Sequence, residues 1–203
     1  MIDIRIALNG DLNSIVNIHN QAFSDFFLTK LGDGFLRLYY RSMCGSDGAV
    51  TLCAIEDGKM VGFSTTAIRS AGFNIRLVKD NIKSFVWEAL KLLILNPKSL
   101  IHLIRNMSKT NNEVVDNGDY AELFSIGVSP DYQGKGIGSK LLMETERILA
   151  CKGVNQISLT TDKFDNDATI AFYRRCGYEV MYEFTTYPNR DMIRFIKNVN
   201  ECE

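Results

Sequence analysis

A glycine-rich stretch at residues 129–140 is the part of the sequence best suited to chemistry on an anion. It reads Ser-Pro-Asp-Tyr-Gln-Gly-Lys-Gly-Ile-Gly-Ser-Lys, with Gly134, Gly136 and Gly138 at alternate positions, and an amphipathic helical pattern follows. Glycines leave backbone amides uncovered, and the helix dipole adds partial positive charge where the first amides of a helix converge on a bound anion. The spacing therefore predicts a loop that binds a pyrophosphate.

Two familiar phosphate-binding loops do not fit this spacing. A P-loop requires Gly-x-x-x-x-Gly-Lys-Ser/Thr, but its first position here is Ser129, and Lys135 is followed by Gly136. The dinucleotide fingerprint Gly-x-Gly-x-x-Gly also fails, because the third glycine comes at Gly138 and is followed by Ser139. The remaining pattern is Gln-x-x-Gly-x-Gly, and a tight turn without any ligand is the alternative interpretation.

The strand-like run just before this loop carries two unusual residues. Gly127 lies inside the run, and an interior strand glycine commonly marks a β-bulge or a close backbone approach, so we expect a bulge near Ile126 and Gly127. Amides freed there could stabilise a carbonyl oxyanion, while an ordinary strand glycine is the alternative. Glu122 is a carboxylate among apolar residues; it is a candidate general base or, alternatively, one half of an ion pair.

Two segments resemble the conserved motifs of the GNAT acyltransferases. Residues 121–142 resemble motif A, a strand that leads through Val-x-Pro-x-Tyr-Gln-Gly-x-Gly-Ile-Gly into an amphipathic helix. Residues 166–178 are similar to motif B, Asn-x-x-Ala-Ile-x-Phe-Tyr-x-x-x-Gly-Tyr, with Thr169 in place of the usual alanine. Both motifs occur in the family order, and the resemblance extends from Ile4 to about Lys197.

The resemblance implies a GNAT fold and acetyl-CoA as cosubstrate. This fold is α/β (α+β), with a central mixed, mostly antiparallel twisted sheet flanked by helices. In the family, loop amides bind the coenzyme A pyrophosphate, which assigns that role to Gln133, Gly134, Lys135, Gly136, Ile137, Gly138 and Ser139. The amides of Ile126 and Val128, on either side of Gly127, would hold the thioester carbonyl while the pantetheine arm pairs with the strand edge.

The same resemblance gives roles to three side chains. Tyr173 matches the tyrosine whose hydroxyl faces the coenzyme sulfur and is the expected general acid, while a core aromatic residue is the alternative. Glu122 lies where some family members place a catalytic glutamate. Asn166 would hydrogen-bond the pantetheine arm, although an asparagine beside Asp165 and Asp167 is equally suited to cap a helix.

Hydrophobic periodicity predicts the elements that must position these residues. Strands are expected at 1–7, 50–55, 59–68, 120–128, 156–161, 178–186 and 192–199. Helices are expected after Asp11 as a cap, over 23–43 with breaks at Gly32 and Gly34, and over 138–150 and 167–176. The Asp57-Gly58 pair predicts a hairpin.

Residues 71–118 form an insertion between two strands that a compact domain would join with a few residues. Apolar residues in 85–95 and 100–107 predict two short helices, and neither run approaches the roughly 20 residues needed to span a bilayer. We expect Trp87 and its leucine neighbours to form a packed lid or the face of a homodimer, while a site for an acyl chain is the alternative.

Composition narrows the class of protein. The chain of 203 residues fits one domain, 1–203, and its net charge of -1 leaves no basic field that would attract nucleic acid. Five scattered cysteines and two histidines do not suggest a metal site. The charged first residues are unlike a signal peptide, so a reducing, cytoplasmic location is expected. His19, on an apolar helix face, is expected to be a packing residue with satisfied hydrogen bonds.

These observations predict an N-acyltransferase that moves an acetyl group from acetyl-CoA to the amine of a small-molecule acceptor, by direct attack on the thioester. A protein lysine or N-terminal acetyltransferase is one alternative, and a non-catalytic coenzyme A-binding module is another. The apolar insertion favours a small acceptor, because a peptide would need an open groove.

Overall fold

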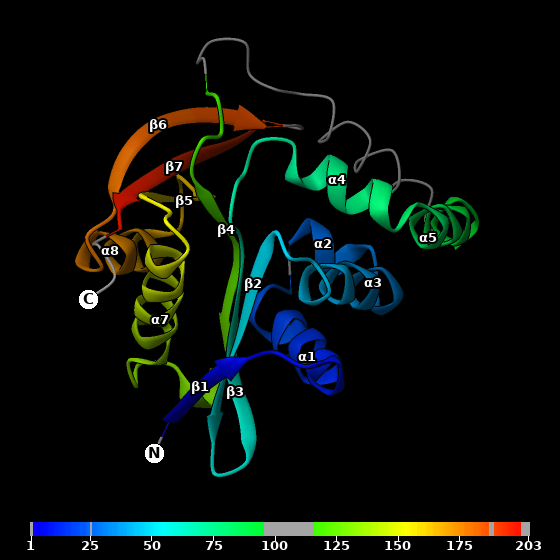
Figure 1. The fold of residues 1–203 in the computed structure, drawn as a ribbon, viewed down its shortest axis with the longest axis horizontal. Coiled ribbons are helices and arrows are strands. Elements are labelled where there is room, and N and C mark those ends of the chain that lie inside the picture. Colours follow the sequence, from blue (N-terminus) through cyan, green and yellow to red (C-terminus); the bar gives the residue numbers. More distant parts are fainter. Residues whose placement is uncertain (1, 25, 96–115, 187–188, 200–203) are drawn as a thin grey trace.

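The computed structural model describes residues 2–24, 26–95, 116–186 and 189–199. They form one seven-stranded sheet in the order β1-β2-β3-β4-β5-β7-β6, with helices on both faces (Figure 1). Every neighbouring pair is antiparallel except β4 and β5, which are parallel. The predicted mixed, mostly antiparallel sheet is therefore confirmed.

The elements follow the predicted order. The strands are β1 (Ile2–Ile6), β2 (Ala49–Glu56), β3 (Lys59–Ala67), β4 (Ala121–Val128), β5 (Gln156–Asp162), β6 (Glu179–Thr186) and β7 (Arg190–Asn198). The helices are α1 (Leu12–Ala22), α2 (Phe27–Lys30), α3 (Asp33–Cys44), α4 (Phe73–Asp80), α5 (Ile82–Leu95), α7 (Ile137–Cys151) and α8 (Asp167–Arg175), with short 3-10 turns η1 (Asn9–Asp11) and η2 (Pro130–Tyr132).

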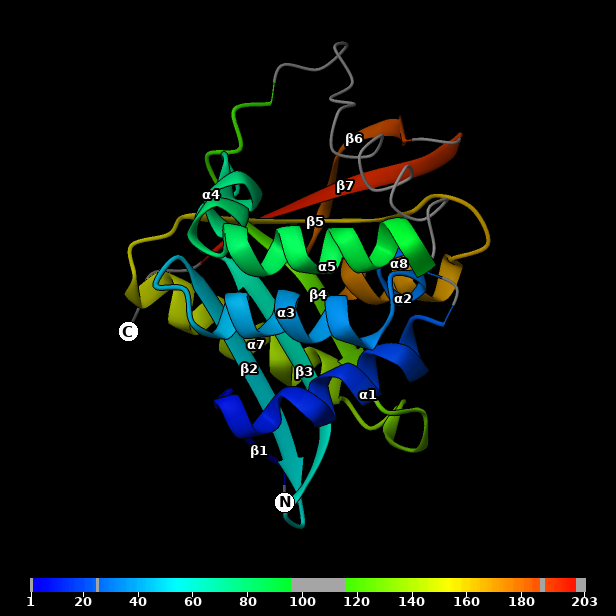
Figure 2. The same ribbon diagram turned by 90° about the vertical axis from the view of Figure 1, so that its right-hand side faces the viewer.

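Helical periodicity explains the two helix layers. α1, α3 and α5 lie on one side of the sheet, and α7 and α8 lie on the other (Figures 1 and 2). Leu141, Leu142 and Leu149 of α7 are buried at spacings that place them on one side of a helix. This apolar side packs against the sheet and places the N-terminus of α7 beside the end of β4.

Two local predictions fail for identifiable reasons. Asp11 precedes α1 but makes no side-chain cap, because its carboxylate instead accepts hydrogen bonds from Arg5, at 2.7 and 2.9 Å, and from the Leu8 amide. Gly34 does not interrupt α3; the break occurs at Gly32 alone, whose φ is +86°. The hairpin prediction is confirmed, with the turn at residues 57–58.

The insertion contributes two described helices, one of which was not predicted. The unpredicted helix α4 stacks Phe73 on Phe124 of β4, with ring centroids 5.7 Å apart. α5 packs Phe85 against Phe35 of α3 at 5.9 Å. Trp87 is 61% exposed, so the packed lid does not hold for this residue, and the homodimer face stays a prediction. The second predicted helix, 100–107, lies outside the described residues. Among the described residues, no helix is long and apolar enough to cross a bilayer.

Candidate functional site

The predicted anion-binding loop forms a glycine turn that leads directly into α7. Gly134 and Gly136 have φ of +76° and +75°, a left-handed conformation that L side chains adopt at a cost. A Cβ atom on either residue would meet no heavy atom within 4 Å. Both positions therefore need glycine for backbone shape, and the space beside them is open.

The head of α7 presents donors that the helix itself does not use. The first described intrahelical bond here runs from the Lys140 amide to the Gly136 carbonyl at 3.1 Å, and the first amides of a helix have no acceptor within it. Lys135 and Lys59 place their Nζ atoms over the Tyr132 ring, at 4.4 and 5.7 Å from its centroid. Free amides and two cations make this end of the molecule suited to a diphosphate.

Packing connects this loop to the second motif. A Cβ atom on Gly138 would lie 3.2 Å from the Cζ of Phe172 in α8, so a larger residue at position 138 would press on the Phe172 ring. Ser139 and Cys176 make a second contact between the two helices, with Oγ and Sγ 3.8 Å apart. The two sequence motifs thus form one structural unit.

β4 and β5 pair over only three residues before they separate. The paired residues are Ala121 with Ile157, Glu122 with Ser158, and Leu123 with Leu159. β4 then continues to Val128, and β5 turns with β7 in a different direction (Figure 2). The edge of β4 that includes Ile126, Gly127 and Val128 is therefore unpaired on the β5 side within the described sheet.

β4 carries a bulge, but not at the predicted position. Thr65 of β3 pairs with Ser125, while the next residue, Thr66, pairs with Leu123, so Phe124 is the extra residue. The predicted bulge is present in this strand, but it lies at Phe124 and not at Ile126 and Gly127.

Close packing explains why residue 127 is glycine. Gly127 is in regular register with Phe63 of β3. A Cβ atom there would lie 2.9 Å from Cε1 of the Phe63 ring and 3.4 Å from Cε2 of Phe23. The glycine makes room for aromatic side chains and does not itself distort the strand.

Glu122 is inside an ion-pair network that the sequence did not reveal. Its Oε1 accepts a hydrogen bond from Nη1 of Arg194 at 3.0 Å, and its Oε2 accepts one from the Ser70 hydroxyl. The side chains of Glu122 and Arg194 are 14% and 13% exposed. The ion pair considered as an alternative is present and partly buried, and the role of general base stays a prediction.

Asp116 completes the same network from the end of the insertion. Its carboxylate accepts hydrogen bonds from the hydroxyls of Tyr120 and Tyr182 and from the Gly118 amide, and it lies 3.5 Å from Nε of Arg194. These bonds and the neighbouring positive charge hold the pKa of Asp116 below its usual value against the opposing effect of burial. Two carboxylates therefore share one guanidinium.

Tyr173 meets the requirements of both interpretations. Its side chain is buried, with ring centroids 5.8 Å from Tyr178 and 6.0 Å from Phe195, as a core aromatic residue would be. Burial also raises the pKa of Tyr173 well above 10, so the hydroxyl keeps its proton at neutral pH. The hydroxyl of Tyr173, on α8, is thus available as a hydrogen-bond donor.

Asn166 precedes α8 but does not cap it with its side chain. Its Nδ2 donates to Thr161 Oγ1 at 2.7 Å and to the Asp162 carbonyl at 3.0 Å, which fixes α8 to the end of β5. Because both amide hydrogens are used, only Oδ1 would be available to a ligand.

His19 is part of a buried chain of polar groups that ends on β4. Its Nδ1 lies 2.6 Å from the hydroxyl of Tyr40, which donates to Ser125 Oγ at 3.3 Å. The expectation of satisfied hydrogen bonds is wrong for Nε2, which is buried without a hydrogen-bond partner among the described residues. Burial lowers the pKa of His19 to about 4, so the ring is neutral at pH 7.

Acid should therefore destabilise the protein through His19. Below pH 6.5 the unfolded chain protonates this histidine while the folded chain does not until about pH 4, so unfolding becomes easier as pH falls. Between pH 7 and pH 4 we expect wild type to lose about 3 kcal/mol more unfolding free energy than His19→Asn, as measured by urea denaturation. Equal losses in the two proteins would contradict this account.

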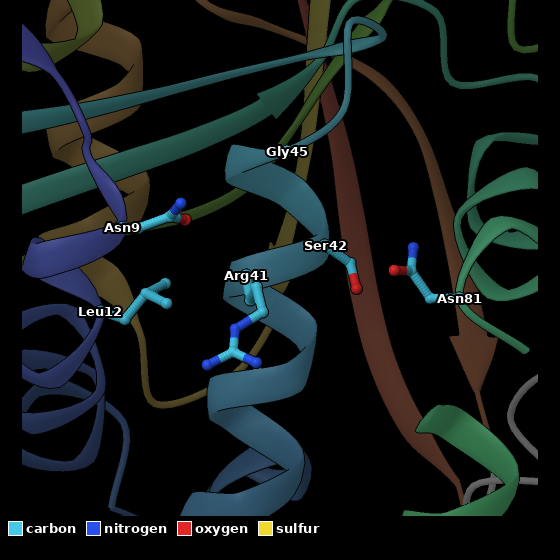
Figure 3. A pocket seen from close by; sticks show the side chains of 6 residues that line it. All are labelled: Asn9, Leu12, Arg41, Ser42, Gly45 and Asn81. Carbon is cyan, nitrogen blue, oxygen red and sulfur yellow. The ribbon is translucent and has the colours of Figure 1, made fainter. Parts of the chain in front are cut away.

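A cavity of about 530 Å³ lies away from these residues, between the start of α1, the end of α3 and the turn before α5 (Figure 3). It is lined by Asn9, Leu12, Arg41, Ser42, Gly45 and Asn81. None of the predicted site residues contributes to it. Among the described residues there is also no cluster of histidine, cysteine and acidic side chains that could hold a metal ion.

The mixed sheet, its split parallel pair and the glycine turn at the head of α7 define the GNAT class of fold. The chain belongs to the GNAT acetyltransferase family, because the model of the acetyltransferase (GNAT) family matches residues 12–178. An acetyltransferase of Sodalis glossinidius is 36% identical over 64 residues, which cover 32% of this chain and 44% of that protein. An acetyltransferase of Pectobacterium atrosepticum is 31% identical over 81 residues, which cover 37% of this chain and 57% of that protein.

Solved structures support the same fold at low sequence identity. The ribosomal-protein-alanine N-acetyltransferase from Brucella melitensis superposes with a TM-score of 0.65 and 20% identity, covering 97% of this chain and 99% of that one. The PaiA N-acetyltransferase from Thermoplasma acidophilum, in complex with coenzyme A, gives 0.53 and 16%, covering 96% and 98%. These likenesses establish the fold, while the curated relatives are matched over less than two thirds of their length.

Proposed function

We propose that this protein transfers an acetyl group from acetyl-CoA to the amine of a small-molecule acceptor. The observation that carries the proposal is the open glycine turn at the head of α7, placed beside the point where β4 and β5 separate. Family membership supports the acetyl group as the group transferred. Acetyl-CoA supplies that group as a thioester.

The loop residues fit a coenzyme diphosphate. The space beside Gly134 and Gly136 is open, the first amides of α7 are free of helical acceptors, and Lys135 adds positive charge. The backbone that would hold the diphosphate comprises Gln133, Gly134, Lys135, Gly136, Ile137, Gly138 and Ser139.

The unpaired edge of β4 fits the pantetheine arm. Amides of Ile126 and Val128 would stabilise the charge that develops on the carbonyl oxygen, and Gly127 keeps this segment close to β3. The free Oδ1 of Asn166 would accept a hydrogen bond from the arm.

Glu122 would accept the proton of the acceptor amine, and Tyr173 would act as the hydrogen-bond donor to the leaving thiolate. An amine with a pKa near 10.4 is almost fully protonated at pH 7, and the Glu122 carboxylate would take a proton from it directly or through water. Tyr173 would donate a hydrogen bond to the departing sulfur.

The elements around the bulge favour a small acceptor. Phe73 of α4 stacks on Phe124, and Asp116, at the end of the insertion, joins the network that contains Glu122. α4 and Asp116 would therefore lie on the side of β4 from which an acceptor approaches.

An assay of thiol release tests the proposal. Purified protein is incubated with acetyl-CoA and a panel of polyamines, amino sugars, amino acids and lysine-containing peptides, and free coenzyme A is measured. We expect release that depends on at least one small amine. Release with peptides alone would support a protein acetyltransferase, and coenzyme binding without any turnover would support a non-catalytic module.

A further inference from the structure

The side chain of Arg194 extends from β7 past β5 to β4. Arg194 lies on β7, in register with Thr160 of β5. Its Nη1 donates to Ser158 Oγ of β5 at 3.2 Å and to Glu122 Oε1 of β4 at 3.0 Å. One guanidinium therefore bridges three strands.

The contacts of Arg194 lie close to the point where β4 and β5 separate. Ser158 and Glu122 are register partners, and the pair that follows them, Leu123 with Leu159, is the last before β4 and β5 separate. The residue after Leu123 is the bulge residue, Phe124. Arg194 thus ties the two halves of the sheet together at the base of the split and fixes Glu122 next to the bulge.

Arg194 is itself held on several sides. Asp116 lies 3.5 Å from its Nε. The rings of Tyr120, Tyr182 and Phe184 have centroids 5.5, 5.8 and 6.0 Å from its Cζ. A planar guanidinium suits this environment, because it stacks on aromatic rings and donates in fixed directions at the same time.

We propose that Arg194 is the positioning residue for Glu122 in acetyl transfer, an inference that rests on the proposed function. Arg194 fixes Oε1 and Ser70 engages Oε2, so the carboxylate is held in one orientation while each oxygen keeps a lone pair for the acceptor. Without Arg194 the carboxylate loses its charged partner and its fixed orientation, and the proton acceptor no longer faces the amine in a defined way.

A double-mutant cycle on turnover tests this role. Glu122→Gln and Arg194→Met are each expected to lower kcat about 100-fold, and the double variant is expected to be no slower than Glu122→Gln alone. Two independent losses would instead multiply to about 10,000-fold. The KM for acetyl-CoA should remain within about threefold in all three variants, because the coenzyme loop is untouched.

Lys197→Met is the matched control. Lys197 lies on the same strand and pairs with Glu146 of α7 at 2.6 Å, with side-chain exposures of 25% and 13%. The Lys197→Met substitution therefore removes a similarly shielded ion pair, on the side of the sheet that α7 covers. Its kcat should stay within about threefold of wild type.

Arg194→Lys keeps the test decisive if Arg194→Met does not fold. Lysine retains the charge, but it lacks the planar guanidinium that stacks on the aromatic rings while it donates to Glu122 and Ser158. We therefore expect a near-native melting temperature and about a tenfold lower kcat. Wild-type kcat in Arg194→Lys, or multiplying losses in the cycle, would overturn the inference while leaving acetyl transfer intact. Absence of any thiol release by wild type would refute the proposed function, and this inference with it.

Discussion

Glu122→Gln is expected to lower kcat for acetyl transfer by about 100-fold or more while the affinity for acetyl-CoA stays unchanged. Glutamine has the same shape and can still accept the hydrogen bond from Arg194, but its amide cannot take a proton from an ammonium group. The hydrogen-bond partners of Glu122 are Arg194 and Ser70, neither of which belongs to the glycine turn. Steady-state kinetics and calorimetric titration with acetyl-CoA separate the two effects.

Glu146→Gln is the appropriate comparison for this variant. Glu146 is also a shielded carboxylate, 13% exposed, and it accepts hydrogen bonds from Lys197 and Tyr178 on the α7 side of the sheet. Its replacement should leave kcat within about threefold of wild type. If both variants keep wild-type turnover, Glu122 is not the base; if both lose turnover equally, the effect is on folding.

Gly136→Ala should weaken coenzyme A binding by about 5-fold to 30-fold. Alanine in a left-handed conformation costs about 1–2 kcal/mol, and the loop can relieve that strain by turning its amides away from the diphosphate. Because no heavy atom lies within 4 Å of the new methyl group, a steric clash does not contribute. Calorimetric titration with coenzyme A measures the effect directly.

The chain provides a close control for this prediction in Gly153. Its φ is also +75°, and a Cβ atom there would likewise meet nothing within 4 Å, but it lies just beyond the other end of α7. Gly153→Ala should therefore leave coenzyme affinity unchanged, because the strain it introduces lies at the other end of α7 from the glycine turn. Equal affinities in the two variants would rule out the glycine turn as the diphosphate site.

The sequence was sufficient for features that depend on neighbouring residues. Hydrophobic periodicity predicted a strand at residues 120–128, where β4 lies. The Asp57-Gly58 pair predicted the hairpin, and alternate glycines before an amphipathic run predicted the turn at the head of α7. In each case the signal is local, since a few adjacent backbone dihedrals and one apolar face determine the outcome. Family motifs then placed these elements in one fold.

Only the tertiary structure decided how distant residues meet. Gly127 indicated a bulge, but the bulge lies at Phe124, because the register of β3 against β4 depends on packing along both strands. Arg194 meets Glu122, 72 residues earlier in the chain, and nothing local to either residue reveals that contact. The sequence by itself thus determined the glycine turn and its neighbouring strand. The pairing of Glu122 with Arg194 was decided by the tertiary structure, because a charged side chain that is shielded from water is stabilised by the groups that lie near it in space.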